Sequence, residues 1–167
     1  DYREPLAVTS NPTDSDEFYF SAITASGQAG IFQLNSQGDV NLLYQGDPLV
    51  LPVALHVSAN GRLLHIVDLV AENSGKLFSF DLRLRMLEEL APLTDLQDPA
   101  GVAFDPDIPS LLFTGRFPDV ELGTIWELQV ADITPMPIPL DPALVLNDPS
   151  HLVRLASEPT MYVYDSH

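Results

Sequence analysis

The sequence predicts an all-β fold made of repeated four-stranded units, and three observations lead to that prediction. Prolines recur at nearly equal spacing along the 167 residues, at Pro5, Pro52, Pro99 and Pro149. After each proline come a short apolar segment, a polar turn and a stronger apolar segment. The apolar segments alternate with a period of two and are rich in β-branched and aromatic residues, which is typical of strands. Because a repeat of about 47 residues matches a blade of roughly 40–50 residues, we expect a β-propeller.

Each complete unit is expected to contain four antiparallel strands in chain order, and the last unit only the first two. The first strand follows the proline, at residues 6–8, 53–57, 100–104 and 150–155. The second follows a polar turn, at residues 18–23, 63–69, 111–117 and 161–166. The third starts at or near a glycine, at residues 30–34, 75–82 and 123–130. The fourth is more polar, at residues 39–45, 85–93 and 133–140.

Two of the fourth strands need separate arguments. Residues 83–93 could form one or two helical turns, since Glu88 and Glu89 suit a helix. The matching segments of the other units do not suit a helix, so we predict an edge strand here. The prolines within 133–140 fit an outermost strand, where a missing N–H costs no ladder hydrogen bond.

We expect one incomplete propeller domain over residues 1–167. Its blades are predicted at about 5–47, 52–95, 99–141 and, as a partial fourth blade, 149–167. Propellers usually close with four to eight blades, and we expect a ring of about six to eight here. The remaining blades are therefore predicted to come from the same gene product or from another polypeptide.

An open ring should also leave apolar surface uncovered, which soluble monomers avoid. On the first blade we expect such a face around Leu6, Val8, Phe18, Phe20 and Ile23. The last unit should lack a third strand beside residues 161–166.

Composition excludes several classes of protein and partner. A hydrophobic content of 46% excludes a disordered acidic tail. A net charge of −17 argues against nucleic acid and anionic lipid as partners, because both need a basic surface. No apolar run reaches the roughly 18 residues of a membrane span. With no cysteine, the chain has no disulfide, thiolate metal ligand or cysteine nucleophile.

The same composition bears on the compartment. The sequence has a single lysine, a strong acidic excess and a first residue, Asp1, that is not methionine. Acidic surfaces with little lysine suit salty media, where screening tolerates net charge. We expect an exported protein, extracellular or periplasmic.

Residues 57–82, VSANGRLLHIVDLVAENSGKLFSFDL, and 98–116, DPAGVAFDPDIPSLLFTGR, resemble repeats of known propellers. The resemblance is to senescence-marker/gluconolactonase-type propellers and to NHL-like repeats, and it lies in turn and core positions. It implies a six-bladed propeller. In the lactonase-type enzymes it also implies a divalent metal in the central funnel, held partly by an asparagine after a proline. Ala100 stands at that position and cannot bind a metal, whereas Ser150 and His151 would make a different site.

Candidate site residues lie in the loops expected to converge on the central funnel. The ligand or funnel candidates are Asp68, Asp98, Arg116, Asn147, Asp148 and His151, with Glu72, Asn73, Asp119 and Glu121 in the same loops. Asp98, Asp148 and His151 are the candidate metal ligands, and Ca²⁺ is the possible cofactor, since it prefers carboxylate and carbonyl oxygens. The alternative, which we favour, is that aspartates before prolines cap turns and that acidic loops are solvated.

No known catalytic motif appears in these blades. The sequence has no G-x-S-x-G elbow, phosphate loop or dinucleotide fingerprint. Its histidines, His56, His65, His151 and His167, lack the spacing of a zinc site. We interpret His65, which alternates with apolar neighbours, as a packing residue close to His56. The sequence therefore favours a non-catalytic propeller module that binds a partner protein or ligand, or serves as a structural subunit. The alternative is a Ca²⁺-dependent lactonase or hydrolase of the gluconolactonase-like type.

Overall fold

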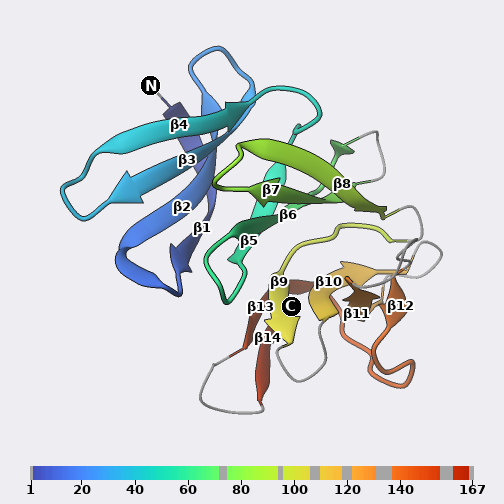
Figure 1. Cartoon of the computed structure of the whole chain (residues 1–167). Coiled ribbons are helices and arrows are strands. Elements are labelled where there is room, and N and C mark those ends of the chain that lie inside the picture. The colour runs from blue at the N-terminus through green and yellow to red at the C-terminus, as the bar shows by residue number, and fades with distance from the viewer. Residues whose placement is uncertain are drawn as a thin grey trace.

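The computed structural model describes residues 2–71, 75–93, 96–105, 110–117, 122–130, 137–154 and 160–165. Within them lie fourteen strands in four separate antiparallel sheets, which radiate from a common centre (Figure 1). The first blade contains β1 (Tyr2–Asn11), β2 (Asp14–Thr24), β3 (Ala29–Asn35) and β4 (Val40–Gln45). The second contains β5 (Pro52–Val57), β6 (Leu63–Asp68), β7 (Lys76–Asp81) and β8 (Met86–Pro92).

The third blade contains β9 (Val102–Asp105), β10 (Ser110–Arg116), β11 (Gly123–Gln129) and β12 (Ile138–Pro139). The partial fourth blade contains β13 (Pro149–Arg154) and β14 (Met161–Asp165). In every sheet, neighbouring strands are consecutive in the chain. Three complete four-stranded blades and part of a fourth confirm the predicted fold class. Among the described residues, no helix has the length and hydropathy to cross a bilayer.

The outer strands predicted for the second and third blades are strands in the described part of the structure. Residues 86–92 form β8, with Glu88 opposite Ser79 and Glu89 opposite Phe78 on β7. Ladder pairing therefore overrides the helix propensity of the two glutamates. In the third blade, β12 contains Ile138 and Pro139, and residues 133–136 of the predicted strand lie outside the described part.

The strand register repeats from blade to blade. Phe20 faces Phe32, Ile66 faces Phe78, and Phe113 faces Trp126. Phe78 and Trp126 thus occupy the same blade position. The equivalence matters because residues at one register position pack against the same side of the neighbouring blade.

The core is divided into layers between successive blades. The first layer joins Tyr19 and Ile31 of the first blade to Ile66 and Phe78 of the second. The second layer joins Val67 and Leu77 of the second blade to the third blade. The buried residues that the third blade contributes are Val102, Leu111, Phe113, Trp126 and Leu128. The third joins Ile125 to Leu152 of the fourth blade. Since apolar burial contributes about 25 cal/mol per Å², these layers hold the blades together.

The open face of the first blade differs in part from the expectation. Val8 is 69% exposed, as expected. Phe20 is only 7% exposed, because Tyr2 of β1 lies across Phe20 and Phe32, with ring centroids at 4.8 and 5.3 Å. The prediction that Phe20 is uncovered is therefore wrong: a neighbouring aromatic on the same blade buries it.

The one lysine of the sequence is also buried. Lys76 begins β7, and its ammonium group donates a hydrogen bond to the Glu89 carboxylate on β8 at 2.6 Å. The pair lies across adjacent strands, so it ties the third and fourth strands of the second blade.

Candidate functional site

A central cavity of about 970 Å³ lies along the innermost strands β1, β5, β9 and β13. Most of the described residues around it are apolar, and its polar members are Thr9, Ser10, His56 and His151. These lining residues include no Asp, Glu, Lys or Arg. In a chain with 24 acidic residues, the cavity is therefore a neutral, apolar region bordered by a few polar groups.

His56 and His65 form a cross-strand pair beneath this cavity. They are directly opposite each other in the register of β5 and β6. The sequence alone predicted only that they lie close together. Burial lowers the pKa of His56 to about 4, and burial together with the nearby His56 lowers the pKa of His65 to about 4. Nδ1 of His65 has no hydrogen-bond partner in the described part. Both rings are thus neutral at pH 7, and His65 packs in the core as predicted.

Three of the predicted site residues come together at the junction of the third and fourth blades. The Arg116 guanidinium at the end of β10 lies 2.8 Å from the Asp98 carboxylate and 3.4 Å from that of Asp148. The two aspartates precede β9 and β13. A cation bound between them would have to compete with this arginine.

Asp68 lies apart from that group and is fully buried. Its carboxylate accepts backbone N–H groups of Val50, Leu51, Val70 and Ala71, at 2.8–3.1 Å. These bonds fix the chain that enters β5. Both carboxylate oxygens of Asp68 therefore accept backbone hydrogen bonds, and the residue has a structural role here.

Asp165 has the corresponding position in the fourth blade. It accepts the backbone N–H of Asn147 at 3.1 Å and that of Asp148 at 2.6 Å. Asp165 faces Pro149 in the register, as Asp68 faces Pro52. In the sequence, both aspartates follow their anchor proline at the same distance. This spacing could have identified both as residues that fix the turn.

His151 lies on the cavity wall and is exposed. Its ring meets that of Tyr164 edge to face, with centroids 6.3 Å apart. The structure thus places His151 on the cavity and Asp98 and Asp148 around Arg116. Glu72, Asn73, Asp119 and Glu121 lie outside the described residues. Among the residues that are described, no group of three or more His, Asp or Glu side chains could hold a metal; the Ca²⁺ site stays a prediction.

Glu17, on β2 of the first blade, is hydrogen-bonded to its neighbours. Its carboxylate accepts hydrogen bonds from the side chains of Asn11, Tyr19 and Gln33. Burial opposes ionisation, but the three donors outweigh it and lower the pKa of Glu17.

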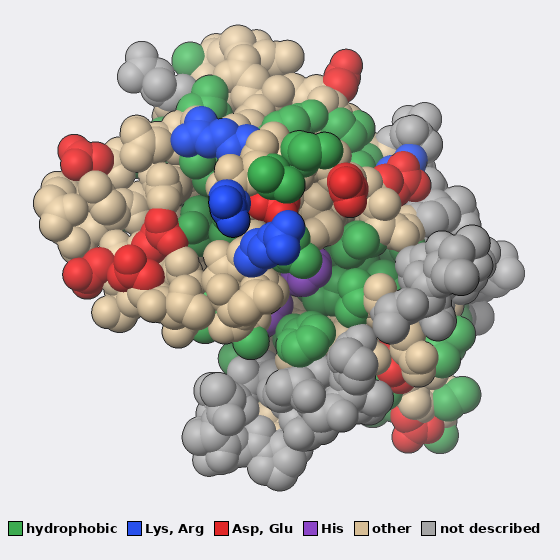
Figure 2. All heavy atoms as spheres, viewed as in Figure 1, with side chains coloured by type: hydrophobic (Ala, Val, Ile, Leu, Met, Phe, Trp, Pro, Cys, Tyr) green, Lys and Arg blue, Asp and Glu red, His purple; other side chains and the backbone are tan. Residues whose placement is uncertain are grey.

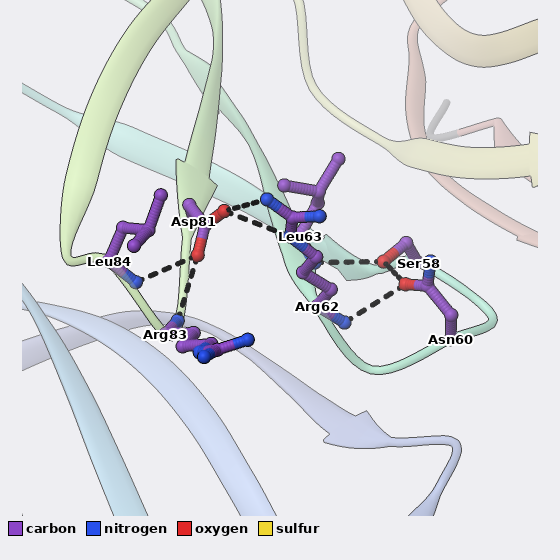
Figure 3. A network of polar contacts seen from close by, with 7 residues as sticks. All are labelled: Ser58, Asn60, Arg62, Leu63, Asp81, Arg83 and Leu84. Atoms are coloured by element: carbon purple, nitrogen blue, oxygen red, sulfur yellow. Dashed lines mark hydrogen bonds and ion pairs between the residues drawn. The ribbon is translucent and has the colours of Figure 1, made fainter.

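A second polar network, which sequence reasoning missed, surrounds Asp81 (Figure 3). The Asp81 carboxylate accepts the backbone N–H groups of Arg83 and Leu84 and binds the Arg62 guanidinium at 2.9–3.0 Å. The Leu84 N–H is the main cause of the lowered pKa of Asp81. The backbone of Arg62 is fixed as well, because its N–H donates a hydrogen bond to the side-chain oxygen of Asn60. In the sequence, the turn at residues 58–62 (SANGR) indicated a hairpin. It did not indicate that Arg62 of this hairpin binds Asp81 in the next one.

Solved structures share this architecture. A chain in the crystal structure of a nidogen/laminin complex matches with a TM-score of 0.74 and 17% identity, over 96% of this chain and 56% of that one. The tricorn protease matches with a TM-score of 0.63 and 11% identity, over 96% and 19%. The β-propeller domain of the Trilobed protease from Pyrococcus furiosus matches with a TM-score of 0.55 and 13% identity, over 99% and 54%. The chain is a β-propeller.

This propeller spans about half the length of the nidogen/laminin neighbour. No family model matches its sequence, and no curated protein matches it. At such low identities the likeness concerns the fold, so the function has to be argued from the residues of this propeller.

Proposed function

We propose that this propeller is a non-catalytic binding module whose central cavity receives an uncharged, apolar segment of a partner protein. The observation that carries the proposal is the absence of charge among the described lining residues of a cavity of about 970 Å³. Protein pockets that bind ligands are typically about 300–1,000 Å³, mostly apolar, with a few polar groups that orient the ligand. Thr9, Ser10, His56 and His151 would be those polar groups here.

The charge distribution supports an apolar partner over a cation. Metal ions such as Ca²⁺ need several oxygen ligands, and cationic ligands need nearby carboxylates. The described residues of the cavity wall include no carboxylate, and Asp98 and Asp148 already pair with Arg116. One structural neighbour was solved as a nidogen/laminin complex, which is a precedent for protein binding by a similar fold.

Further propeller blades belong to the same proposal. Tyr162 and Tyr164 on β14 are more than half exposed. In the register, Tyr164 corresponds to Val67, which is fully buried between the second and third blades. We propose that additional blades, from the same gene product or another polypeptide, cover this face. We also propose export to an extracellular or periplasmic compartment, which cell fractionation with an antibody would test.

The cavity is tested with Nile red, an uncharged apolar dye, by fluorescence titration. The variant Val8→Asn/Val153→Asn places amides at two exposed cavity positions. Val40→Asn/Val50→Asn makes the same changes at exposed valines that do not line the cavity. We expect severalfold weaker dye binding in the first variant only. Equal dye binding by both variants would overturn the proposal. Stoichiometric Ca²⁺ binding, measured by calorimetry, would also overturn it and would favour the lactonase alternative.

A further inference from the structure

Two arginines of the second blade have no acidic partner among the described residues. Arg83 and Arg85 are exposed in the β7–β8 turn. The other cationic side chains that the structure describes are paired, as Arg3 with Glu4, Arg62 with Asp81, Lys76 with Glu89, and Arg116 with Asp98 and Asp148. With 24 acidic residues against 7 basic ones, unpaired arginines are the exception that needs explaining.

The Asp81 network brings a third arginine to the same corner. The Asp81 backbone carbonyl accepts the Arg85 N–H at 2.7 Å, while its carboxylate holds the turn at Arg83 and the side chain of Arg62. Leu84 and Met86, in the same segment, are more than half exposed. We call Arg62, Arg83, Leu84, Arg85 and Met86 the arginine patch. Figure 2 shows basic side chains close together on one face, with apolar and acidic side chains beside them.

The backbone at Arg85 adds an independent observation. Its φ is +57°, in the left-handed region that side chains with a Cβ disfavour. The β3–β4 turn of the first blade also has one left-handed residue, and there it is Gly38, with φ +87°. A glycine would relieve the strain at position 85, so local structure does not explain the arginine. Strain that persists in this way points to a use for the side chain.

We propose that the arginine patch binds an acidic segment of a partner protein, with apolar residues between its carboxylates. Guanidinium groups bind carboxylates through paired, charge-assisted hydrogen bonds, and Leu84 and Met86 supply apolar contact. A short segment senses only the local field, because charges are screened beyond about 8 Å at physiological salt. Nucleic acid or an anionic membrane would meet the rest of a surface whose net charge is −17.

This site is separate from the cavity proposed above. None of its residues lines the cavity. A partner could therefore occupy the two surfaces independently, and each surface can be tested without the other.

The test uses a fluorescein-labelled peptide of alternating glutamate and leucine, followed by fluorescence anisotropy below and at about 0.15 M salt. We expect Arg83→Glu/Arg85→Glu to weaken binding about tenfold or more. The control Arg3→Glu changes an exposed arginine of the first blade that pairs with Glu4, and it should leave the affinity within about twofold. Arg85→Gly should weaken binding while the thermal unfolding midpoint stays equal or rises, because the strain is removed.

Equal peptide affinity of the double variant and the unaltered protein would overturn the inference. So would tighter binding to phosphatidylserine vesicles than to the peptide, or binding that does not weaken with salt. Nile red binding in the double variant should be unchanged, so a failure here is distinguishable from a failure of the cavity proposal.

Discussion

Burial keeps two histidines of the second blade uncharged. His56 and His65 face each other on β5 and β6, and burial is the main cause of the low pKa of both. An unfolded chain would give each histidine its ordinary pKa of about 6.5. The native state therefore resists protonation of the pair.

The stability of the protein should consequently depend on pH between about 6.5 and 4. In this window the unfolded state binds more protons than the native state, so the free energy of unfolding decreases as the pH is lowered. At about 1.4 kcal/mol per pKa unit, the loss is expected to reach a few kcal/mol by pH 4. Urea unfolding at several pH values measures it. His56→Leu/His65→Leu should flatten the dependence, whereas His151→Gln, at an exposed position, should keep it; an unchanged slope in the double variant would contradict the assignment.

Strands are the elements that the sequence predicts best, because period-two alternation and turn residues are local signals. β8 was predictable only by comparison with its repeats, since its own glutamates favour a helix. The partners of Asp68 and Arg116 were not predictable, because they depend on distances between chain segments that are separate in the sequence. The cover that Tyr2 provides over Phe20 was missed because Tyr2 precedes the repeating register.

Contact between the third and fourth blades should depend on Gly101. A Cβ at this position would lie 2.4 Å from the backbone nitrogen of Leu152 on β13, and a backbone atom cannot rotate away. Gly101→Ala should therefore destabilise the protein by about 2 kcal/mol or more. At Gly30 the nearest atoms belong to the side chains of Phe32 and Thr24, at 3.0–3.2 Å, so Gly30→Ala should cost less. Thermal unfolding compares the two, and equal midpoints would contradict this packing of the blades.

Taken as a whole, the molecule has two unlike end faces. On the first blade, Tyr2 covers Phe20 and Phe32, so little of that aromatic pair reaches water. On the fourth blade, Tyr162 and Tyr164 remain exposed. The aromatic pair of the first blade is thus covered, although Val8 stays exposed, whereas both tyrosines of β14 are exposed.

Changes at the two faces should have opposite effects on self-association. Tyr162→Ser/Tyr164→Ser should reduce association of the isolated 167-residue chain, because it removes exposed apolar area. Tyr2→Ser should increase association, since it uncovers the Phe20 and Phe32 rings. Sedimentation velocity at several protein concentrations measures both. A decrease in both variants, or in neither, would show that the two faces are alike.

The burial of Lys76 protects the one lysine of the sequence from acylating reagents in the native protein. The sequence has one side-chain amine, and its salt bridge to Glu89 holds it between β7 and β8. Acylating reagents such as succinimidyl esters therefore have no accessible lysine on the folded surface. The amine becomes available when β8 separates from β7, so the rate of acylation at Lys76 reports how often the second blade opens. The mass of the peptide that contains Lys76 then records local unfolding without any engineered label.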